Sequence, residues 1–405
     1  SEKRDRNSRM NSFQGNTHTT TVHLPYDAMI HEARTPDTKN GAQTGFYPGG
    51  EYIFQKHFTA PQAWQGKPVS LVFEGVYQTA LVYLNGWLLT RNVNGYAEFT
   101  VEAGPYLKYG ADNLLKVIAD NSLEPNSRWY TGSGIYRPVR LLVGNKVYLP
   151  QDTVRITTRE ADEGFALLDV TAQVQSASTV TERVTLQQTI CRKGTAVLTD
   201  RQNLLLQPGE SRTVSFRYCV DSPALWSPEN PNLYTSIMQV LEGEEELDRE
   251  ETGFGIRTLS IDAAHGVRIN GQTVKLRGAC IHHDNGILGA ATLPDAEERR
   301  IRQLKEAGFN AIRSSHHPAG RALLDACDRY GVLVMDELSD VWNVRKNPYD
   351  YALYFEQDWK PTIQKMVAKD YNHPSVILYC VGNEISEAGS ESGAETNRRL
   401  CNTFR

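Results

Sequence analysis

The sequence predicts three domains in a row: a jelly-roll β-sandwich, an immunoglobulin-like β-sandwich, and the first half of a (β/α)8 TIM barrel. Its 405 residues are too many for one typical hydrophobic core, so two or three domains are expected. Short strand-like runs separated by turn residues extend to about residue 258. Strand-like and helix-like segments then alternate, as in a β/α barrel. We therefore expect domains at 1–147, 148–258 and 259–405.

The first domain is predicted from short apolar runs bounded by turn signals such as Pro48-Gly49-Gly50 and Asn85-Gly86. This punctuation is typical of a β-sandwich or jelly roll. A linker is expected at 144–150. The predicted strands are 52–58, 69–73, 80–84, 114–119 and 139–143.

The second domain is again β-rich, with a Pro-rich segment at 225–231. Several short strands with turn signals between them fit an immunoglobulin-like sandwich. The predicted strands are 166–174, 180–190, 213–218 and 234–241.

The third domain alternates strands with amphipathic helices. Asp295 can cap the first helix, with Glu298 in the capping-box position, and Gly308 ends it. The second helix ends at Gly331, and the third carries an apolar stripe around Trp359. The predicted strands are 274–281, 309–313, 332–335 and 375–381.

The unit length indicates how much of a barrel is present. One strand and helix together span about 34 residues, which suits the roughly 250 residues of eight units. The sequence contains only four such strands. Half a barrel leaves open sheet edges and uncovered apolar faces, so we expect the chain to be the front part of a longer protein.

Composition argues against several classes of function. The formal net charge of -5 disfavours nucleic acid as a main partner. No apolar run approaches the roughly 20 residues of a membrane span, so no membrane partner is expected. The six cysteines show no metal-ligand spacing, and we expect reduced thiols and a cytoplasmic location.

All four predicted barrel strands end in polar residues. Closure of a barrel brings the carboxyl ends of its strands around one mouth, where catalytic groups lie. Glu384 directly follows an apolar run, where a carboxylate contributes nothing to the core, so it is the leading candidate for a general acid. The four ends are His282-His283-Asp284, Ser314-Ser315-His316-His317, Asp336-Glu337 and Asn383-Glu384.

A metal site is one chemistry that these residues could support. Neighbouring residues of a strand point to opposite faces, so only one histidine of each pair could reach a shared ion. The candidate ligands are His282, His283, Asp284, His316 and His317.

A carboxylate pair is the other chemistry. Glycoside hydrolysis needs a protonated acid and a second carboxylate as nucleophile or base. Glu384 fits the acid, Asn383 could hydrogen-bond a sugar hydroxyl, and Glu337 or Asp340 could be the second carboxylate. The alternative for this region is a structural ion-pair network of Asp336, Glu337 and arginines such as Arg277 or Arg313.

Five segments resemble one known family, in the same order along the chain from about Thr21 onward. The run from Asn372-His373-Pro374 to Gly382-Asn383-Glu384 resembles the acid/base signature of glycoside hydrolase family 2, which includes β-galactosidases, β-glucuronidases and β-mannosidases. Residues 128–137 (RWYTGSGIYR) are similar to the family's sugar-binding motif. Segments 225–234, 275–278 and 310–318 resemble its immunoglobulin-like domain and its first two barrel strands.

The resemblance implies a retaining exo-glycosidase that releases terminal β-linked sugars. Glu384 would protonate the glycosidic oxygen and then act as base on water, and Asn383 would contact the sugar 2-hydroxyl. His316 and His282 would line the sugar pocket. The family's nucleophile is a second Glu near the end of the seventh strand, which this sequence does not reach. We therefore expect the 405-residue chain alone to be inactive.

Two positions depart from the family pattern. Some members place an acidic sugar contact where this chain has Arg128, which either contacts the sugar differently or packs. Some large members bind magnesium after the third strand, where this chain reads Leu338-Ser339-Asp340-Val341-Trp342. No metal or other cofactor is assigned, with Mg²⁺ and Na⁺ left open. Asp340 is kept as a substrate-binding candidate.

Within the family, the sequence most resembles the β-galactosidase-like branch. The two segments that carry this resemblance are His-His-Asp after the first strand and the loop 347–351. β-Glucuronidase is the alternative. A non-catalytic carbohydrate-binding protein and a fragment that acts only when assembled with the rest of the enzyme are the other hypotheses. The expected partner is a carbohydrate substrate, with a homo-oligomer or the C-terminal half of the same enzyme as further partners.

Overall fold

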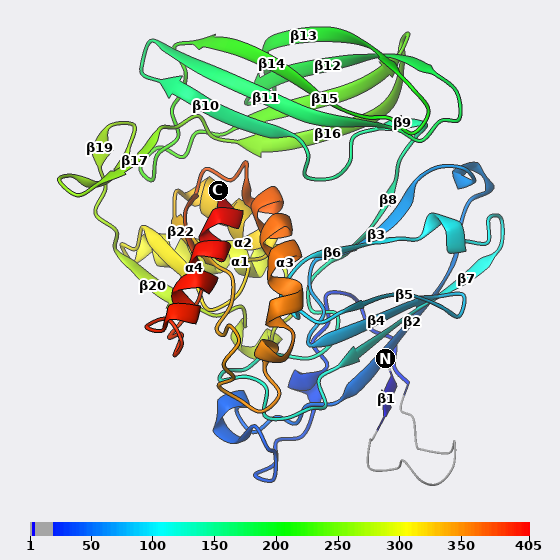
Figure 1. Ribbon diagram of the computed structural model, residues 1–405, viewed down its shortest axis with the longest axis vertical. Coiled ribbons are helices and arrows are strands. Elements are labelled where there is room, and N and C mark those ends of the chain that lie inside the picture. The colour runs from blue at the N-terminus through cyan, green and yellow to red at the C-terminus, as the bar shows by residue number, and fades with distance from the viewer. Residues whose placement is uncertain (1, 5–18) are drawn as a thin grey trace.

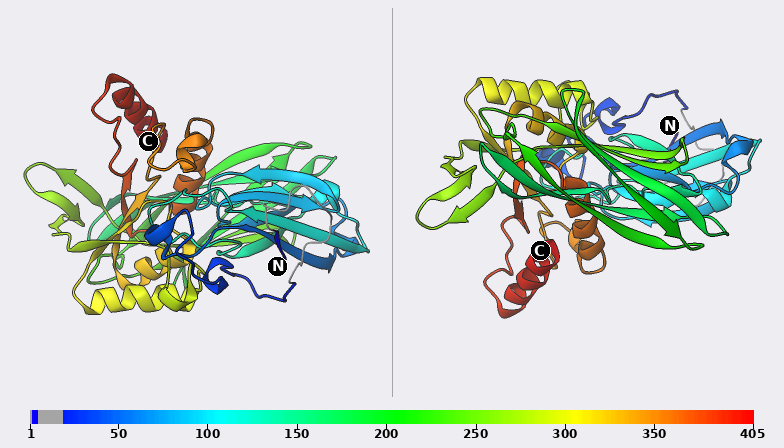
Figure 2. Two further views of the ribbon diagram at one scale, coloured as in Figure 1. Left: turned by 90° about the horizontal axis from the view of Figure 1, so that it is seen from below. Right: turned by 90° about the horizontal axis from the view of Figure 1, so that it is seen from above.

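The structure, a computed structural model, describes residues 2–4 and 19–405. Figure 1 shows the first sandwich in blue and cyan, the second in green, and the half barrel in yellow to red. The half barrel contacts both sandwiches, and Figure 2 shows its last helix, α4, projecting from the body of the molecule. The predicted order of two β-sandwiches and a partial barrel is confirmed.

The first sandwich packs an antiparallel sheet of order β1-β2-β7-β4-β5 against a sheet of order β6-β3-β8. Alternate residues of β4 are buried, as expected for a sheet with one face on the core. Phe73 of β3 and Val82 of β4 meet in that core. The strands are β1 (Glu2–Arg4), β2 (Glu51–Thr59), β3 (Val69–Phe73), β4 (Thr79–Leu84), β5 (Trp87–Asn92), β6 (Phe99–Glu102), β7 (Asp112–Asp120) and β8 (Val139–Val143).

The second sandwich packs a sheet of order β10-β11-β14 against one of order β13-β12-β15-β16. β9 lies inside the predicted linker and pairs with β11, so the second sandwich takes up part of that segment. The strands are β9 (Val147–Tyr148), β10 (Arg155–Ala161), β11 (Phe165–Ser176), β12 (Glu182–Arg192), β13 (Thr195–Leu206), β14 (Ser211–Asp221), β15 (Tyr234–Glu242) and β16 (Glu245–Phe254).

A small antiparallel sheet joins the second sandwich to the half barrel, whose own sheet is parallel and of order β20-β21-β22-β23. The small sheet contains β17 (Leu259–Asp262), β18 (Gly266–Ile269) and β19 (Gln272–Thr273). The barrel elements are β20 (Gly278–Ile281), α1 (Pro294–Glu306), β21 (Ala311–Ser314), α2 (Arg321–Tyr330), β22 (Leu333–Glu337), α3 (Phe355–Asp370), β23 (Val376–Cys380) and α4 (Glu391–Phe404).

Two local predictions in the barrel are wrong. The first strand begins at Gly278, because the Asn310 side chain bonds the backbone of Lys275 and Arg277 and replaces a strand ladder there. The first helix is entered through Leu293 and Pro294, since proline suits the first helical position. Asp295 therefore lies in the first turn, where its charge complements the helix dipole without capping it.

The concave face of the parallel sheet is open. Cys280 of β20 is exposed there. An apolar hollow on this face is lined by residues such as Leu276, Met335 and Leu378. Each of the six cysteines has a free thiol. Among the helices that the structure describes, none is both long and apolar enough to cross a membrane.

The half barrel meets the second sandwich through apolar packing. Trp226 is fully buried among Ile269, Leu333 and Ile377, and its indole Nε1 donates to the Asp328 carbonyl at 2.9 Å. It meets the first sandwich through charged groups and aromatic rings. Arg321 of α2 pairs with Glu98 of the first sandwich at 2.8 Å, and the ring of Tyr96 stacks on His317. Arg321 also pairs at 2.7 Å with Asp152, which lies between β9 and β10 of the second sandwich.

Candidate active site at the barrel mouth

The two histidine pairs after β20 and β21 separate onto two faces, as the strand pleat requires. The His282 and His316 rings lie 5.8 Å apart, and both pack on Trp129 of the first sandwich, at 5.0 and 5.6 Å. The His283 and His317 rings lie 4.9 Å apart on the other side. The predicted alternation is therefore present, and only His282 and His316 share a face with Trp129.

His283 and His317 belong to the interface with the first sandwich. Tyr96 stacks on His317 with ring centroids 4.0 Å apart, and His283 Nε2 bonds the Thr131 carbonyl at 2.9 Å. Burial outweighs that hydrogen bond and lowers the pKa of His283 to about 3, and burial also lowers the pKa of His317 well below its usual value. Both rings are therefore neutral packing elements at physiological pH.

Among the described residues, one group of carboxylate and histidine side chains with metal-ligand spacing lies on the side of the second sandwich. It consists of Asp325, Asp328 and His373. In that group Asp328 already bonds His373 Nδ1 at 2.6 Å and accepts from the Ser375 backbone N–H at 3.0 Å.

Glu337 lies in an ion-pair network at the end of β22. Its side chain is 0% exposed, and its carboxylate accepts hydrogen bonds from Nε and Nη2 of Arg313 at 2.9 and 2.5 Å. His316 Nδ1 bonds the same carboxylate at 3.0 Å. Of the arginines considered from the sequence, Arg313 is the partner.

Asn383 and Glu384 follow β23 directly. The Asn383 side chain accepts from Arg313 Nη2 at 3.2 Å and donates to Asp340 Oδ1 at 2.9 Å. Glu384 has a left-handed backbone, with φ +44°, and its side chain is 68% exposed. Such a conformation costs a non-glycine residue of the order of 1 kcal/mol or more and is concentrated at functional sites.

Arg128 joins the first sandwich to this strand end. Its Nη1 donates to Glu384 Oε2 at 2.9 Å, while Nε and Nη2 donate to both oxygens of Asp340 at 3.0 and 2.6 Å. The hydrogen bond to Asp340 raises the pKa of Arg128 despite partial burial. Burial alone would raise the pKa of the Asp340 carboxyl. Hydrogen bonds from Arg128, Asn383 and Lys346 outweigh burial, and they hold this pKa below its usual value.

Lys346 completes the group and was missed from the sequence. Its ammonium donates to Asp340 Oδ1 at 3.0 Å and to the carbonyls of Asp340 and Asn383, both at 2.7 Å. It lies in the loop between β22 and α3, where no pattern in the sequence distinguishes it from a solvated lysine. Trp129 was also missed, although it adjoins Arg128 in the segment singled out above.

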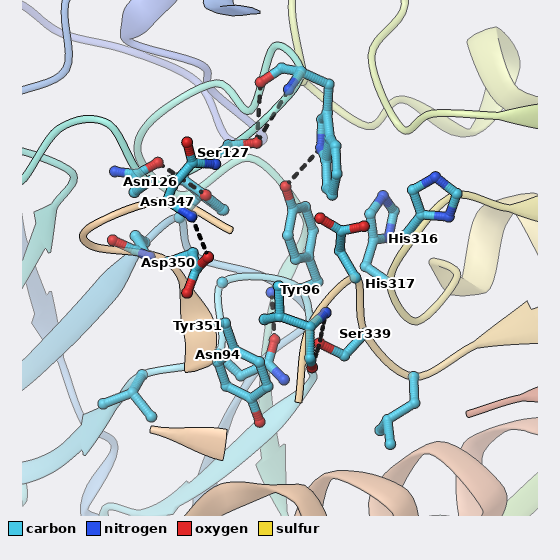
Figure 3. A pocket seen from close by; sticks show the side chains of 18 residues that line it. Asn94, Tyr96, Asn126, Ser127, His316, His317, Ser339, Asn347, Asp350 and Tyr351 are labelled. Carbon is cyan, nitrogen blue, oxygen red and sulfur yellow. Dashed lines mark hydrogen bonds between the residues drawn. The ribbon is translucent and has the colours of Figure 1, made fainter. Parts of the chain in front are cut away.

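A small pocket opens beside these groups (Figure 3). Asn94, Tyr96, Asn126 and Ser127 line it from the first sandwich, facing His316 and Asp350 from the barrel side. The Trp129 indole donates to the Tyr96 hydroxyl at 3.0 Å. Two domains therefore build one polar and aromatic wall next to Asp340.

The predicted site residues thus fall into two connected groups. Arg128, Asp340, Asn383 and Glu384 contact one another directly. His316 and His282 pack on Trp129, the residue next to Arg128. Burial lowers the pKa of His282, and the neighbouring His316 lowers it further. Residues that follow each of the four barrel strands converge with one sandwich loop, as expected for a barrel mouth.

Comparisons with known proteins agree in all three domains. Residues 5–165 match "Glycosyl hydrolase 2 galactose-binding domain-like", 147–257 match "Glycosyl hydrolases family 2", and 263–400 match "Glycosyl hydrolases family 2, TIM barrel domain". The β-galactosidase BoGH2A of Bacteroides ovatus is 38% identical over 92% of this chain and 44% of its own length. A putative β-glucuronidase of Formosa agariphila is 33% identical over 90% of this chain and 34% of its own length.

Solved structures give the same result. A glycosyl hydrolase family 2 member from Bacteroides cellulosilyticus has a TM-score of 0.92 and 37% identity, covering 95% of this chain and 50% of that one. A β-glycosidase from Bacteroides vulgatus has a TM-score of 0.87 and 32% identity, covering 95% and 49%. The chain spans half or less of the length of these relatives. With three consecutive domains matched in the family's order, this chain belongs to glycoside hydrolase family 2.

Proposed function

We propose that this chain supplies the sugar-binding sandwich and the acid/base half of the active site of a retaining exo-glycosidase acting on terminal β-linked sugars. The observation that carries the proposal is the position of Glu384. It follows Asn383 at the carboxyl end of a parallel strand, with its carboxylate exposed at the mouth and in contact with Arg128 of the sandwich. An exposed carboxylate at that place serves catalysis better than folding.

In this proposal Glu384 donates a proton to the departing glycosidic oxygen and then takes one from the water that releases the sugar. Asn383 contacts the sugar 2-hydroxyl, and His316 and His282 line the sugar pocket beside Trp129. Arg128 forms the rim on the sandwich side.

The second carboxylate lies outside this chain in the proposed mechanism. Glu337 is fully buried and bonded by Arg313 and His316, which suits a structural role better than attack on a sugar. Asp340 accepts hydrogen bonds from three side chains, so neither carboxylate is a free nucleophile. We accordingly expect no turnover from residues 1–405 alone. A homo-oligomer and a separate C-terminal half remain the proposed protein partners, and the cytoplasmic location stays a prediction.

β-Galactosides are the proposed substrates, because the β-galactosidase BoGH2A is more similar to this chain than the putative β-glucuronidase, at 38% against 33% identity. β-Glucuronides are the second candidate. They are supported by a likeness, at 26% identity and a TM-score of 0.80, to a Bacteroides uniformis β-glucuronidase bound covalently to cyclophellitol-6-carboxylate aziridine. Matched aryl β-galactoside and β-glucuronide assays on the enzyme that carries this chain separate the two.

The acid assignment is tested with Glu384→Gln in the enzyme that carries this chain. Loss of a general acid should reduce kcat/KM by about 10²- to 10⁴-fold on a methyl glycoside, whose leaving group needs a proton. The dinitrophenyl glycoside of the same sugar should suffer much less at its glycosylation step. Glu391→Gln, an exposed glutamate at the start of α4, is the matched control. Equal losses on the two substrates would contradict the proposal, and so would a neutral outcome.

A further inference from the structure

Asp340 is the centre of a network whose members we call the Asp340 hub: Arg128, Asp340, Lys346 and Asn383. The Asp340 side chain is 11% exposed. Its Oδ1 accepts from Arg128, Lys346 and Asn383 at 2.6, 3.0 and 2.9 Å, and its Oδ2 accepts from Arg128 at 3.0 Å. A carboxylate offers about four acceptor positions. The acceptor positions of Asp340 are therefore filled by donors of the protein, which disfavours a hydrogen bond from a sugar hydroxyl.

Lys346 is equally saturated. An ammonium group has three protons to donate. Here they go to Asp340 Oδ1 and to the backbone carbonyls of Asp340 and Asn383. The Lys346 side chain is only 17% exposed. The lysine thus ties the peptide that immediately precedes Glu384 to the loop after β22.

The loop that carries Lys346 is itself held in place. The buried Asp350 carboxylate accepts from the backbone N–H groups of Lys346 and Asn347, each at 2.7 Å, and from that of Ala352 at 3.1 Å. The backbone of Lys346 is therefore held in place by Asp350, and the hydrogen bond from Lys346 to the Asn383 carbonyl restrains the end of β23 in turn.

Glu384 depends on this support more than an ordinary strand residue would. Its backbone has the left-handed φ of +44°, which the surrounding structure has to maintain. Its carboxylate is mostly exposed and contacts Arg128, whose other guanidinium nitrogens are bound to Asp340. Both the peptide before Glu384 and the side chain itself are thus tied to Asp340. The two cations Arg128 and Lys346 also balance the two anions Asp340 and Glu384.

We propose that Lys346 and Asp340 are positioning residues that fix the acid/base Glu384, and that Arg128 extends this constraint into the first sandwich. The proposal rests on the proposed function, because it assigns a task to Glu384 that only a glycosidase needs. It also gives Asp340 a role different from the direct sugar contact expected from the sequence. A proton donor displaced by about 1 Å loses rate by up to about 100-fold.

The two roles for the hub predict different kinetics. If Lys346 positions the acid, its loss should lower kcat/KM strongly for poor leaving groups and weakly for good ones, because only the former need the proton. If the hub merely binds sugar, its loss should raise KM to the same extent for every leaving group. If it only supports folding, activity and folded fraction should fall together on both substrates.

The experiment compares Lys346→Met and Asp340→Asn in the enzyme that carries this chain, with methyl and dinitrophenyl glycosides of its preferred sugar. We expect kcat/KM on the methyl glycoside to fall about 10- to 100-fold further than on the dinitrophenyl glycoside. Lys305→Met is the matched control. That lysine also donates to two backbone carbonyls, of Pro228 and Gly331 at 2.7 and 3.0 Å, but at the second sandwich. Lys305→Met should change kcat/KM little, and by the same factor for the two substrates.

Glu384→Gln measured in parallel separates this proposal from the proposed function. If Glu384→Gln shows the leaving-group dependence but Lys346→Met and Asp340→Asn do not, the positioning role is refuted and the acid assignment stands. If Glu384→Gln shows none, the proposed function itself fails. Should Lys346→Met not fold, Asp340→Asn, which keeps the size of the side chain, decides the outcome alone.

Discussion

The half barrel is held by two interfaces that differ in kind. The second sandwich contacts it through apolar packing around Trp226, which is fully buried. The first sandwich contacts it through aromatic rings such as Tyr96 on His317, and also through charged groups, with Arg321 on Glu98 and Arg128 on Asp340. Apolar burial has no preferred direction, whereas hydrogen bonds between charged groups fix angles and distances. We infer from this comparison that the second sandwich contributes mainly stability and that the first sets the geometry of the strand end that carries Glu384.

The largest effect is expected from Trp226→Ala, which removes the centre of the apolar interface. Truncation of a fully buried tryptophan costs about 3–5 kcal/mol in unfolding free energy. Chemical denaturation followed by circular dichroism measures it. Trp87→Ala is the control, since Trp87 is 66% exposed and should change the unfolding free energy by less than about 0.5 kcal/mol. Similar losses in the two variants would remove the distinction between the interfaces.

Arg321→Met is the corresponding change at the charged interface. It leaves the buried Glu98 carboxylate without its bidentate partner, at 2.8 and 2.9 Å, and we expect a loss of about 2–3 kcal/mol. Arg159→Met removes an exposed pair with Asp169 and should cost less than about 1 kcal/mol. The same denaturation experiment compares the two variants. A loss from Arg321→Met as small as that from Arg159→Met would show that this interface contributes nothing to the unfolding free energy.

The apolar side also contains one group that should respond to pH. Burial, with Asp152 and Asp248 nearby, raises the pKa of Glu250 in β16 to about 7. The folded chain then holds a proton that the unfolded chain has released, so the unfolding free energy should fall as pH rises from about 4.5 to 7 and level off above that. The rise in pKa from 4.5 to about 7 corresponds to about 3 kcal/mol, and screening by solvent at this partly exposed side chain reduces the expected loss to about 1–2 kcal/mol. Glu250→Gln should flatten this slope in unfolding curves recorded across the window, and an unchanged slope would contradict the assignment.

The smallest effect on stability is expected from Arg128→Met. Arg128 is partly exposed, and Asp340 keeps Lys346 and Asn383 as donors, so the loss should stay below about 1 kcal/mol. Activity of the enzyme that carries this chain should nevertheless fall by about 10-fold or more, because Glu384 loses its contact with the sandwich. If Arg128→Met lowered the unfolding free energy in proportion to activity, the first interface would contribute to stability in the same way as the second, and the distinction between them would fail.

The sequence predicted the elements that carry a strong period and missed those that do not. The apolar run 375–381 and the helix stop at Gly331 correspond closely to β23 and to the end of α2, where Gly331 has a left-handed φ of +66°. β13 and β16 were missed because their side chains are mostly exposed, so no alternation of apolar residues distinguishes them. The helix α4 was not predicted either.

The site was predictable to the extent that strand ends meet. Placing Glu384, Asn383, His316 and His282 near one mouth required only the parallel order of the strands. The Asp340 hub was not predictable, because the contact of Arg128 with Asp340 joins loops of two domains 212 residues apart. Which arginine would bind Glu337 was also open, because the sequence does not give the register of β21 against β22 that places Arg313 beside it.

The left-handed backbone of Glu384 makes this residue a poor choice for stability, and the acid role proposed for it is what would keep it in place. Asparagine or glycine adopts that conformation more easily than glutamate does. A screen that rewards thermal resistance alone should therefore replace Glu384 early and, under the proposed acid role, enrich inactive sequences. Anyone who designs a more robust version of this chain from consensus or stability scores should hold position 384 constant, and should look for compensation at the apolar interface around Trp226.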